Sequence, residues 1–468
     1  MRRPPKVTVY MPAHNYGRYL DRAAESVFAQ SMKDWELIII DDGSTDDTAE
    51  RVKKYEGLPR VRVVRQSRKG LSVSNNIALR LANGRYIMRL DADDYLDENA
   101  LLVMSSVLDR KPGVGLVYPD YWLVDDDGEI LEAVRRKKIG SEARLLDLPA
   151  HGACTLFRKE CLVELGGYEE SIPCQDGYDL WLRFIERFKP DNVNVPLFYY
   201  RQHEGSLTKN ARRILDTRAG IKRRLVQSLR DGSIPKVVGI IPVAKRAKGL
   251  PDSAFALAGG KPLLWHAISQ ALAAKTLDKV VVASNDPDAL AYARRFRGVT
   301  AVERPDRLAD TGTRIVETVR YTLGELKKKR YKPDAAMLLY TNCPLRRAAH
   351  IDMAVDAMTL YGTKSVITVV EETAVCYQHG KDGLHPVQPS RSLQIEKRAI
   401  YRENGAVLLT RLTSMDPDYF IGRDAGHVVM LPEDSLRIRT EYDLWLTDKI
   451  LSEWRAGAPV PQAKEAAR

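Results

Sequence analysis

Apolar runs alternate with amphipathic stretches along the first part of the chain. Val7–Ala13 and Trp35–Asp41 are almost continuously apolar, which is typical of strands buried on both faces of a parallel sheet. Between them, Asp21–Met32 carries its apolar side chains at helical spacing and predicts a helix. The strand, helix, strand order predicts an α/β sheet, in which ligands bind beyond the carboxyl ends of the strands.

A third apolar run, Tyr86–Leu90, ends in three carboxylates within four residues, those of Asp91, Asp93 and Asp94. Like charges this close repel one another unless a cation lies among them. Mg²⁺ and Mn²⁺ prefer one or two carboxylates together with substrate phosphates, so the cluster predicts a metal site for a nucleotide. A solvated turn or a helix cap is the alternative for this stretch taken alone.

The strand Trp35–Asp41 also ends in carboxylates, those of Asp41 and Asp42. Because the carboxyl ends of parallel strands lie at one edge of a sheet, both acidic sites are expected to face one crevice. Asp42 is a candidate acceptor for hydrogen bonds from a nucleobase or a ribose.

The second half of the chain repeats the pattern. Apolar runs at Val237–Pro242, Val280–Ser284, Val366–Val370 and Ala406–Leu409 predict further strands, and Glu441–Trp454 predicts a closing helix. The expected fold class is α/β, with two Rossmann-like nucleotide-binding domains in tandem. The expected divisions are a first domain at 1–205, a basic helical linker at 206–233, a second domain at 234–455 and a flexible tail at 456–468.

The linker carries a marked positive charge. Between Ser206 and Lys236 there are nine basic residues and two acidic ones, and Leu215, Ile221 and Leu225 recur at near-helical spacing. This pattern predicts a helix with one apolar stripe and a solvated basic face. Contact with anionic lipid is the alternative, because basic amphipathic helices also bind membrane surfaces.

Composition narrows the function classes. The 468 residues carry a net charge of +11, with 44% hydrophobic and 29% charged residues, which are globular values. Five cysteines without a CxxC pair argue against a disulfide framework and a zinc site, and indicate a reducing cytosol. The absence of a signal-type segment or an apolar run of ~20 residues predicts a soluble cytoplasmic protein, possible peripheral membrane contact aside. Nucleic-acid binding is disfavoured because no recognisable module accompanies the charge.

Six ordered motifs in the first 205 residues resemble the inverting family-two glycosyltransferases of the GT-A fold. They are Val9–Asn15, Ile39–Asp46, Lys69–Ser72, Asn75–Asn76, Leu90–Asp94 and Gln175–Trp181. The resemblance implies a metal-dependent inverting glycosyltransferase that moves a sugar from a nucleoside diphosphate donor to a hydroxyl of a glycan or lipid-linked acceptor, with Mg²⁺ or Mn²⁺ as cofactor. It also implies a role in surface glycan biosynthesis. The expected location is the cytoplasm, with the inner face of the membrane as the alternative.

The resemblance assigns roles to individual residues. Nucleotide-sugar contacts are expected from Pro12, Asp41, Asp42 and Asp91, and metal contacts from Asp91 and Asp93 of the DxD motif. The expected general base is Asp176, because a carboxylate must take the proton of the attacking hydroxyl. Asp179 is the rival, since Gln175 and Gly177 depart from the usual family pattern here. His203 is a candidate metal or diphosphate contact, and His151 a weaker candidate for facing the acceptor.

Residues 236–453 resemble the acylneuraminate cytidylyltransferases, which join CTP to an acidic sugar. The matching stretches are Ile241–Pro242, Lys248–Pro251, Gly260–Leu263, Ser284–Asp286, Arg304–Pro305, Cys343–Arg346, Tyr401–Ala406 and Asp434–Ser435. Several functional positions of that family differ in this chain, at Ala244, Ser253, Ala254 and Tyr340. The largest departure is at Arg437 and Arg439, where the family has aspartates that hold the catalytic metal.

Two arginines in place of two aspartates change the expected ligand. On a strand, residues two apart share one face, and guanidinium groups there favour an anion over Mg²⁺ because they have no lone pair for a metal. The C-terminal domain is therefore expected to be degenerate at its metal site. The expected ligand pocket comprises Lys245, Arg246, Lys248, Arg346, Asn404, Arg437 and Arg439.

Three readings of the whole chain follow. The first is a glycosyltransferase with a degenerate C-terminal domain that serves as a scaffold or sensor, and the second is a bifunctional enzyme whose C-terminal half makes a CMP-activated acidic sugar. The third, a non-catalytic nucleotide-sugar-binding protein, is disfavoured because the N-terminal carboxylates are intact. A homodimer is expected, with Val375–Ala399 reaching across the partner subunit by resemblance to the dimeric cytidylyltransferases.

Overall fold

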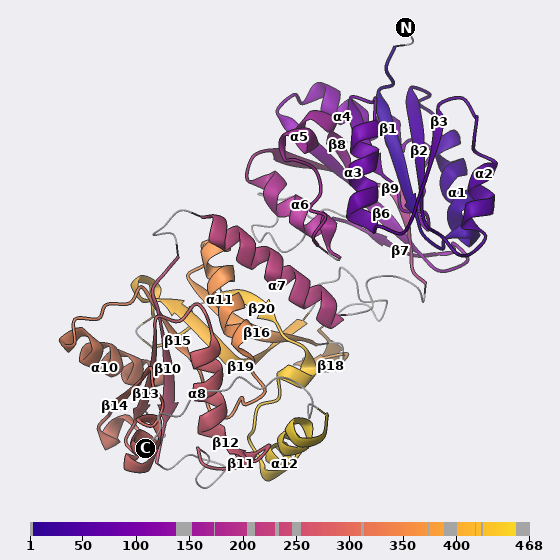
Figure 1. The fold of residues 1–468 in the computed structure, drawn as a ribbon. Coiled ribbons are helices and arrows are strands. Elements are labelled where there is room, and N and C mark those ends of the chain that lie inside the picture. The colour runs from indigo at the N-terminus through magenta and orange to yellow at the C-terminus, as the bar shows by residue number, and fades with distance from the viewer. Residues whose placement is uncertain are drawn as a thin grey trace. The chain divides into compact units, whose positions relative to one another are not determined.

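The computed structural model describes residues 3–136, 152–172, 174–203, 211–229, 234–245, 254–309, 313–372, 374–387, 400–416, 418–422 and 425–454. These residues form two compact units, Met1–Arg218 and Ala219–Arg468 (Figure 1). The division falls inside one helix, α7 (Ala211–Ser228). Both units are layered α/β structures with a central sheet, and the expected fold class is confirmed.

The first unit is built on a nine-stranded sheet with the order β3-β2-β1-β4-β8-β6-β9-β5, and β7 pairs with β6. Its strands are β1 (Val7–Ala13), β2 (Trp35–Asp42), β3 (Val61–Gln66), β4 (Tyr86–Arg89), β5 (Tyr95–Leu96), β6 (Val114–Val124), β7 (Ile130–Val134), β8 (Leu156–Arg158) and β9 (Lys189–Arg201). Its helices before α7 are α1 (Gly17–Phe28), α2 (Thr48–Lys53), α3 (Leu71–Leu81), α4 (Ala100–Arg110), α5 (Lys159–Glu164) and α6 (Asp176–Ile185).

The first four strands of the chain, β1 to β4, are parallel, because a helix connects each of them to the next. β1 pairs in parallel with both β2 and β4, with Ala13 opposite Asp41 and Tyr10 opposite Arg89. All seven residues of β1 are buried, which agrees with the continuous apolar run in the sequence. The carboxyl ends of β1, β2 and β4 therefore meet at one edge of the sheet, as the sequence predicted.

Helix α1 covers this sheet, although its bounds differ from the predicted 21–32. It begins at Gly17 and ends at Phe28, and the chain then turns away. After the helix, the Gln30 side chain ties the chain to the start of α4, since its Nε2 donates to the carbonyl of Asp97 and its Oε1 accepts from the amide of Leu101. Its Nε2 also donates to the carbonyl of Ser26 in α1.

The second unit contains a seven-stranded sheet with the order β14-β13-β10-β15-β19-β16-β20. Its strands are β10 (Val237–Val243), β13 (Lys279–Ser284), β14 (Val299–Glu303), β15 (Ala335–Leu338), β16 (Ser365–Glu372), β19 (Ile400–Arg411) and β20 (Ala425–Val429), with the separate pairs β11 (Leu257–Ala258) with β12 (Lys261–Pro262) and β17 (Tyr377–Gly380) with β18 (Gly383–Pro386). Its other helices are α8 (Leu263–Ala273), α9 (Pro287–Ala293), α10 (Ile315–Lys328), α11 (Ala348–Tyr361) and α12 (Glu441–Lys449).

Both faces of this second sheet are covered. Along β10, Val237 and Ile241 lie in a core with α8 and α11, whereas Val238 and Ile240 lie in a second core with α10. This alternation follows from the two-residue period of a strand, and it explains why the run is apolar throughout.

Two predicted elements of the second unit differ from the structure. The closing helix ends at Lys449 rather than at Trp454, and Ile450–Trp454 forms a wider π-helical turn. The predicted strand through Arg437 and Arg439 does not form. Ile438, between them, bonds through its backbone to Asn342, so this segment is tied to a loop rather than to a sheet partner.

Candidate active site

The acidic cluster after β4 lies at the carboxyl edge of the first sheet. Asp91 and Asp93 lie in a tight turn that is closed by a hydrogen bond of 3.1 Å from the amide of Asp94 to the carbonyl of Asp91. Arg89, the last residue of β4, precedes Asp91 by two positions. Residues two apart on an extended chain share a face, so the guanidinium of Arg89 can reach the Asp91 carboxylate.

A buried chain of polar side chains connects this turn to the start of α6. Nε and Nη2 of Arg89 lie 2.9 and 3.2 Å from the two carboxylate oxygens of Asp91. Nη1 of Arg89 donates to Oδ2 of Asp176 at 2.8 Å, and Nδ2 of Asn75 donates to the same oxygen at 2.8 Å. The structure therefore brings Asp91 of the DxD motif and the expected base Asp176 together on one arginine.

The second carboxylate of the motif has a different partner. Oδ2 of Asp93 lies 3.0 Å from Nε2 of His203, which follows β9. Asp94 is 1% exposed, and its Oδ1 accepts from the backbone amide of Arg201 at 2.9 Å. His203 thus contacts the motif through Asp93, and its expected contact with a metal or a diphosphate stays a prediction.

Burial and mutual repulsion set the electrostatics of this turn. Burial raises the pKa of Asp91 to about 6, with an opposing effect of Arg89 and a further rise from Asp93. Burial also raises the pKa of Asp94 well above its usual value, and Asp93 adds to the rise. Burial alone would lower the pKa of the Arg89 guanidinium, but Asp91 and Asp176 hold it above its usual value. The site carries more negative than positive charge, which favours a bound cation.

The donor set fits a metal that is shared with a substrate. In the described parts of the chain, no three or more His, Cys, Asp or Glu side chains are grouped to hold a metal ion by themselves. Asp91, Asp93 and His203 therefore do not form a closed set of three ligands. Mg²⁺ and Mn²⁺ in nucleotide enzymes take one or two carboxylates and fill the remaining positions with phosphate and water, and Asp91 and Asp93 suit that arrangement.

The nucleotide side of the site is shaped by Asp41 and Asp42. Oδ1 of Asp42 accepts from Nε2 of Gln66 at 2.7 Å and from the amide of Lys69 at 2.8 Å, while its Oδ2 accepts from the amide of Gly70 at 2.8 Å. Asp42 therefore holds the loop before α3. Asp41 uses only Oδ1, which accepts from the amide of Ser44 at 3.0 Å, among the contacts of the described residues.

The other expected nucleotide contact, Pro12, is buried near the end of β1. Beside it, the loop after β1 is braced by Asn15, whose Oδ1 accepts from the amide of Thr45 at 2.7 Å. Asn15 has a φ of 61°, a left-handed conformation that asparagine tolerates better than most residues. The loops after β1 and β2 are thereby joined at the edge of the crevice.

The rival base, Asp179, lies one turn further along α6. Its Oδ2 accepts from Nε and Nη2 of Arg183 at 2.9 and 2.8 Å. Arg183 also donates to the carbonyls of Leu165 and Gly167, so this pair ties the helix to the preceding loop. Asp179 is joined to the chain's own backbone network, whereas Asp176 is joined to the DxD turn.

The start of α6 is held by α7. Nε of Arg218 donates to Oε1 of Gln175 at 2.8 Å, and the guanidinium lies over the ring of Tyr178 at 4.8 Å from its centroid. Gln175 has a φ of 62°. Part of the basic face predicted for the linker helix is therefore used to fix the residue before Asp176.

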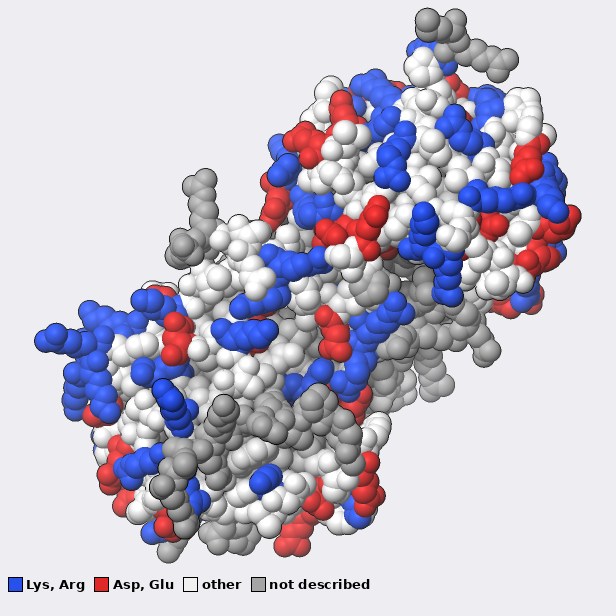
Figure 2. Space-filling model, viewed as in Figure 1, with Lys and Arg blue, Asp and Glu red and all other residues white. Residues whose placement is uncertain are grey.

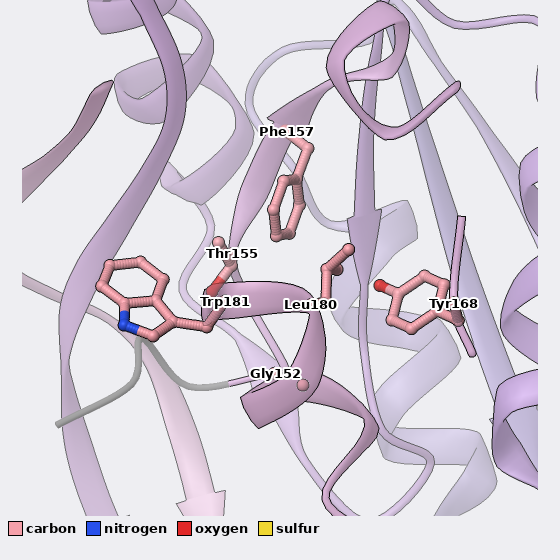
Figure 3. Close-up of a pocket in the computed structure, with 7 residues that line it drawn as sticks. Gly152, Thr155, Phe157, Tyr168, Leu180 and Trp181 are labelled. Carbon is pink, nitrogen blue, oxygen red and sulfur yellow. The ribbon is translucent and has the colours of Figure 1, made fainter. Parts of the chain in front are cut away.

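A small cavity adjoins the start of α6 (Figure 3). Its volume is about 10 Å³, which is room for about one water molecule. It is lined by Gly152, Thr155, Phe157, Tyr168, Gly177, Leu180 and Trp181. Tyr168 also contacts β1, since its hydroxyl lies 3.0 Å from that of Tyr10.

Sequence reasoning assigned no role to Asn75, which lies in one of the motifs, or to Arg89, which directly precedes another. The available signal was the spacing of Arg89 and Asp91 on a strand, which places a cation on the same face as a carboxylate. The contact with Asp176 joins residues 87 positions apart, and no local pattern indicates it. His151 lies outside the described residues.

The expected pocket residues of the second unit are not alike in their surroundings. Arg346 is 2% exposed, and its Nη1 donates to the carbonyl of Ala406 at 2.7 Å, while burial lowers its pKa to about 10. Asn404 is also buried, and its Oδ1 accepts from Oγ1 of Thr368 at 2.6 Å. Both side chains hold the protein itself together, which differs from the expected ligand-facing role.

The two arginines in place of aspartates are more accessible. Arg437 is half-buried, with its guanidinium 5.7 Å from the centroid of the Tyr340 ring, and Arg439 is exposed. Nearby, Nη2 of Arg347 and Nε2 of His350 lie 3.3 and 3.6 Å from Oδ2 of Asp434. Of the remaining expected residues, Lys245 is exposed at the end of the described segment, and Arg246 and Lys248 lie outside the described residues.

Charge elsewhere does not form a continuous positive surface on the face shown in Figure 2, where Lys and Arg are interspersed with Asp and Glu. None of the helices in the described ranges is long and apolar enough to cross a bilayer. The five cysteines are free thiols.

Comparison with known proteins gives two family matches. Residues 8–166 match the model of glycosyl transferase family 2, and residues 238–379 match the cytidylyltransferase model. The chain is 32% identical over 187 residues to chondroitin synthase of Escherichia coli, which is 40% of this chain and 27% of that protein. It thus spans about a quarter of the length of that relative.

A shorter relative is covered more fully. The chain is 30% identical over 217 residues to the putative glycosyltransferase EpsE of Bacillus subtilis, which is 44% of this chain and 77% of that protein. The crystal structure of TarS of S. aureus in complex with UDP-GlcNAc matches 48% of this chain and 68% of that chain, with 17% identity and a TM-score of 0.42. Both resemblances inferred from the motifs are confirmed by the family matches. The chain therefore belongs to glycosyl transferase family 2, and its residues 238–379 match the cytidylyltransferase model.

Proposed function

We propose that the first unit transfers a sugar, with inversion, from a nucleoside diphosphate sugar to a hydroxyl of a glycan or lipid-linked acceptor in surface polysaccharide biosynthesis. The observation that carries this proposal is the buried chain from Asn75 through Asp176 and Arg89 to Asp91, because it places a base candidate next to the DxD turn. The relatives include proteins named for the synthesis of chondroitin and hyaluronan.

Each site residue has one role in the proposed transfer. Asp176 takes the proton of the attacking hydroxyl, since a carboxylate fixed within reach of that hydroxyl is a competent general base. Asp91 and Asp93, with His203, would hold Mg²⁺ or Mn²⁺. When bound, the ion would neutralise charge that develops on the departing diphosphate. Pro12, Asp41 and the loop fixed by Asp42 enclose the nucleoside.

The second unit is proposed to lack cytidylyl transfer. Its family motifs of fold are present, but Arg437 and Arg439 occupy the positions of two metal-binding aspartates, and arginine cannot ligate a metal. A bifunctional synthetase and transferase is the second candidate function, and the family match of residues 238–379 is the observation that favours it. A purely nucleotide-sugar-binding role is the third, which the intact carboxylates of the first unit disfavour.

We also infer a homodimer from the second unit. The described part of the segment expected to reach a partner, 375–387, contains the hairpin of β17 and β18, which pairs with no other described strand. Leu384 on it is 60% exposed and Tyr377 is 48% exposed. An isolated hairpin is marginally stable in water, so apolar side chains on its surface favour a partner.

The proposal includes a location at the inner face of a membrane, and the basic side chains of α7 bear on it. Arg223 of α7 lies 2.9 Å from Oδ1 of Asp356, and Lys222 lies over the ring of Tyr361. These side chains are engaged by the second unit, so the basic face is not wholly available to anionic lipid. The solvated-face reading remains the favoured one.

The test is a screen of UDP-, GDP-, dTDP- and CMP-linked sugars against the full chain, with Mn²⁺ or with excess chelator. A thermal shift detects binding, because a ligand that binds only the folded state stabilises it. Release of nucleoside diphosphate in the presence of oligosaccharide acceptors then measures transfer. Full transfer in excess chelator would reject the metal, and the absence of binding or transfer with every donor would reject the glycosyltransferase proposal.

A further inference from the structure

The Arg89 side chain is buried between two carboxylates that come from distant parts of the chain. Its Nε lies 2.9 Å from Oδ1 of Asp91, and its Nη1 lies 2.8 Å from Oδ2 of Asp176. Only 9% of the side chain of Arg89, and 9% of that of Asp176, is exposed. A planar guanidinium that bonds two carboxylates on different edges fixes both their separation and their orientation.

Arg89 is itself held in place. Its carbonyl accepts from the amide of Cys154 at 2.7 Å, and β4 places it opposite Tyr10. Gly152 lies directly against the guanidinium, because a Cβ at that position would be 2.6 Å from Nη2 of Arg89. The guanidinium therefore occupies a space that exists only because residue 152 has no side chain.

The contacts at Asp176 distinguish its two oxygens. Both Asn75 and Arg89 donate to Oδ2. Among the contacts of the described residues, none engages Oδ1. One oxygen is thus fixed by the protein, and the other keeps its lone pairs for a proton from outside the cluster.

Charge explains why an arginine suits this position. Asp176 is buried and the side chain of Asp91 is 27% exposed, and two unpaired carboxylates this close to one guanidinium would repel each other. The guanidinium of Arg89 lies between the two carboxylates and offsets that repulsion. A neutral residue at position 89 would leave Asn75 as the one described side chain that holds Asp176.

We propose that Arg89 is a positioning residue for transfer: anchored on Asp91, it orients Asp176 so that Oδ1 faces the acceptor hydroxyl. The inference rests on the proposed function, since it assigns the orientation of that function's base. A purely structural ion pair is the competing explanation. The two differ in what is lost when Arg89 is changed, because a structural role affects the folded fraction and a positioning role affects turnover in molecules that remain folded.

The experiment compares the full chain with Arg89→Ala and Arg89→Lys. Turnover (kcat) of Arg89→Ala is expected to fall by roughly 10²-fold, because misplacement of a catalytic group by about 1 Å has that effect. Donor KM and Mn²⁺ affinity, the latter measured without substrate from free Mn²⁺ by electron paramagnetic resonance, are expected to stay within about tenfold. Arg89→Lys is expected to be intermediate, since one ammonium cannot bond both carboxylates in the same geometry.

Chemical rescue supplies the decisive readout. Millimolar guanidinium ion is expected to restore part of the turnover of Arg89→Ala, because the side-chain space beside Gly152 is left open. It is expected to leave Asp176→Asn inactive. The matched control is Arg183→Ala, which removes the arginine paired with Asp179 on the same helix. Its turnover per folded molecule is expected to stay near that of the unchanged protein.

The outcomes separate the two proposals. An unchanged protein that transfers no sugar from any donor rejects the proposed function. Transfer by the unchanged protein, together with full turnover by Arg89→Ala and Arg89→Lys, rejects the positioning role alone. Loss of turnover that matches the loss of folded protein by circular dichroism, or loss of Mn²⁺ binding in the same proportion as turnover, would also reject it.

Discussion

Nε2 of His203 lies 3.0 Å from Oδ2 of Asp93, although 110 positions separate the two residues in the sequence. The segment that carries His203 also makes hydrogen bonds to the DxD turn. Nε of Arg201 donates to the carbonyl of Asp93 at 2.9 Å, and the amide of Arg201 donates to Asp94. The end of β9 therefore fixes the shape of the DxD turn after β4. Changes at either end should be felt at the other.

His203→Ala should weaken Mn²⁺ binding. The imidazole is either a ligand or the partner that orients Asp93, and loss of either kind of group typically lowers metal affinity by about 10–100-fold. Isothermal titration with Mn²⁺ and a donor analogue measures the change. Gln202→Ala, at the preceding residue, is the control and should bind Mn²⁺ normally. Unchanged Mn²⁺ affinity in His203→Ala would contradict a role for this residue at the metal.

A pH dependence follows from Asp91. Burial raises its pKa to about 6, above about 3.9 for an aspartate in an unfolded chain. The folded protein binds this proton more tightly than the unfolded chain does. Protonation of Asp91 therefore stabilises the folded state fully below about pH 4, and this contribution is lost as pH rises through about 6. Mn²⁺ needs the ionised carboxylate, so the thermal shift caused by Mn²⁺ should be larger at pH 7 than at pH 5.

The control for this prediction is Asp91→Asn, which cannot ionise. Its thermal shift with Mn²⁺ should be small at both pH values. An equal Mn²⁺ shift at pH 5 and pH 7 in the unchanged protein would show that protonation of Asp91 does not compete with the metal.

Asp176→Asn should lower turnover by roughly 10²–10⁴-fold while donor affinity stays nearly unchanged, because the amide keeps the shape but cannot take a proton. Asp179→Asn is the matched comparison, since it makes the same change one turn further along α6, at the residue bonded to Arg183. Steady-state kinetics with varied acceptor and donor separate the effects. Normal turnover in Asp176→Asn, with loss in Asp179→Asn, would reverse the choice of base.

The sequence predicted the sheets better than it predicted the site. The apolar runs at Val7–Ala13 and Val237–Pro242 correspond to strands β1 and β10. A strand buried on both faces has apolar residues at almost every position, and this pattern is visible in the sequence. Helix ends were less predictable. Beyond the end of α1, Gln30 bonds residues far away in the sequence, which no local pattern indicates.

The residues of the site could be predicted only where they lie in a recognisable motif. Asp91 and Asp93 follow directly from three clustered carboxylates after a strand. The contact of Arg89 with Asp176 depends on the fold that brings β4 and α6 together, and no spacing along the chain encodes it. For Arg346 the motif was misleading, because the sequence does not show that its guanidinium is buried against backbone carbonyls.

The hairpin of β17 and β18 should mediate dimer formation. Tyr377→Asp together with Leu384→Asp places two charges on an exposed apolar surface, so an interface there should dissociate while the fold is kept. Light scattering of the full chain measures the mass, and circular dichroism checks the fold. Leu102→Asp, at an exposed leucine of α4 in the first unit, is the control and should leave the mass unchanged. A monomeric unchanged protein would contradict the prediction.

The last prediction concerns the second unit, where CTP with Mg²⁺ and a panel of acidic sugars should release no pyrophosphate. Arg437 and Arg439 stand where two aspartates would hold a metal, and Arg437 is fixed beside Tyr340 and Gly405. Two positive charges there repel Mg²⁺ and favour a phosphate or a carboxylate. Pyrophosphate release by the full chain, measured with an enzyme-coupled assay, would therefore contradict the degenerate reading and favour the bifunctional one.

Restoring the carboxylates tests how much of the pocket remains. Arg437→Asp with Arg439→Asp should create Mn²⁺ binding only if the surrounding groups still accept a cation, and Asp443 is an acidic neighbour, since its Oδ2 accepts from the amide of Arg439 at 2.9 Å. Arg294→Asp with Arg295→Asp makes the same charge change at exposed positions after α9 and is the matched control. Because Arg346 and Asn404 are committed to the protein's own hydrogen bonds, we expect metal binding without pyrophosphate release. Recovery of both would show that the two arginines alone had silenced the domain.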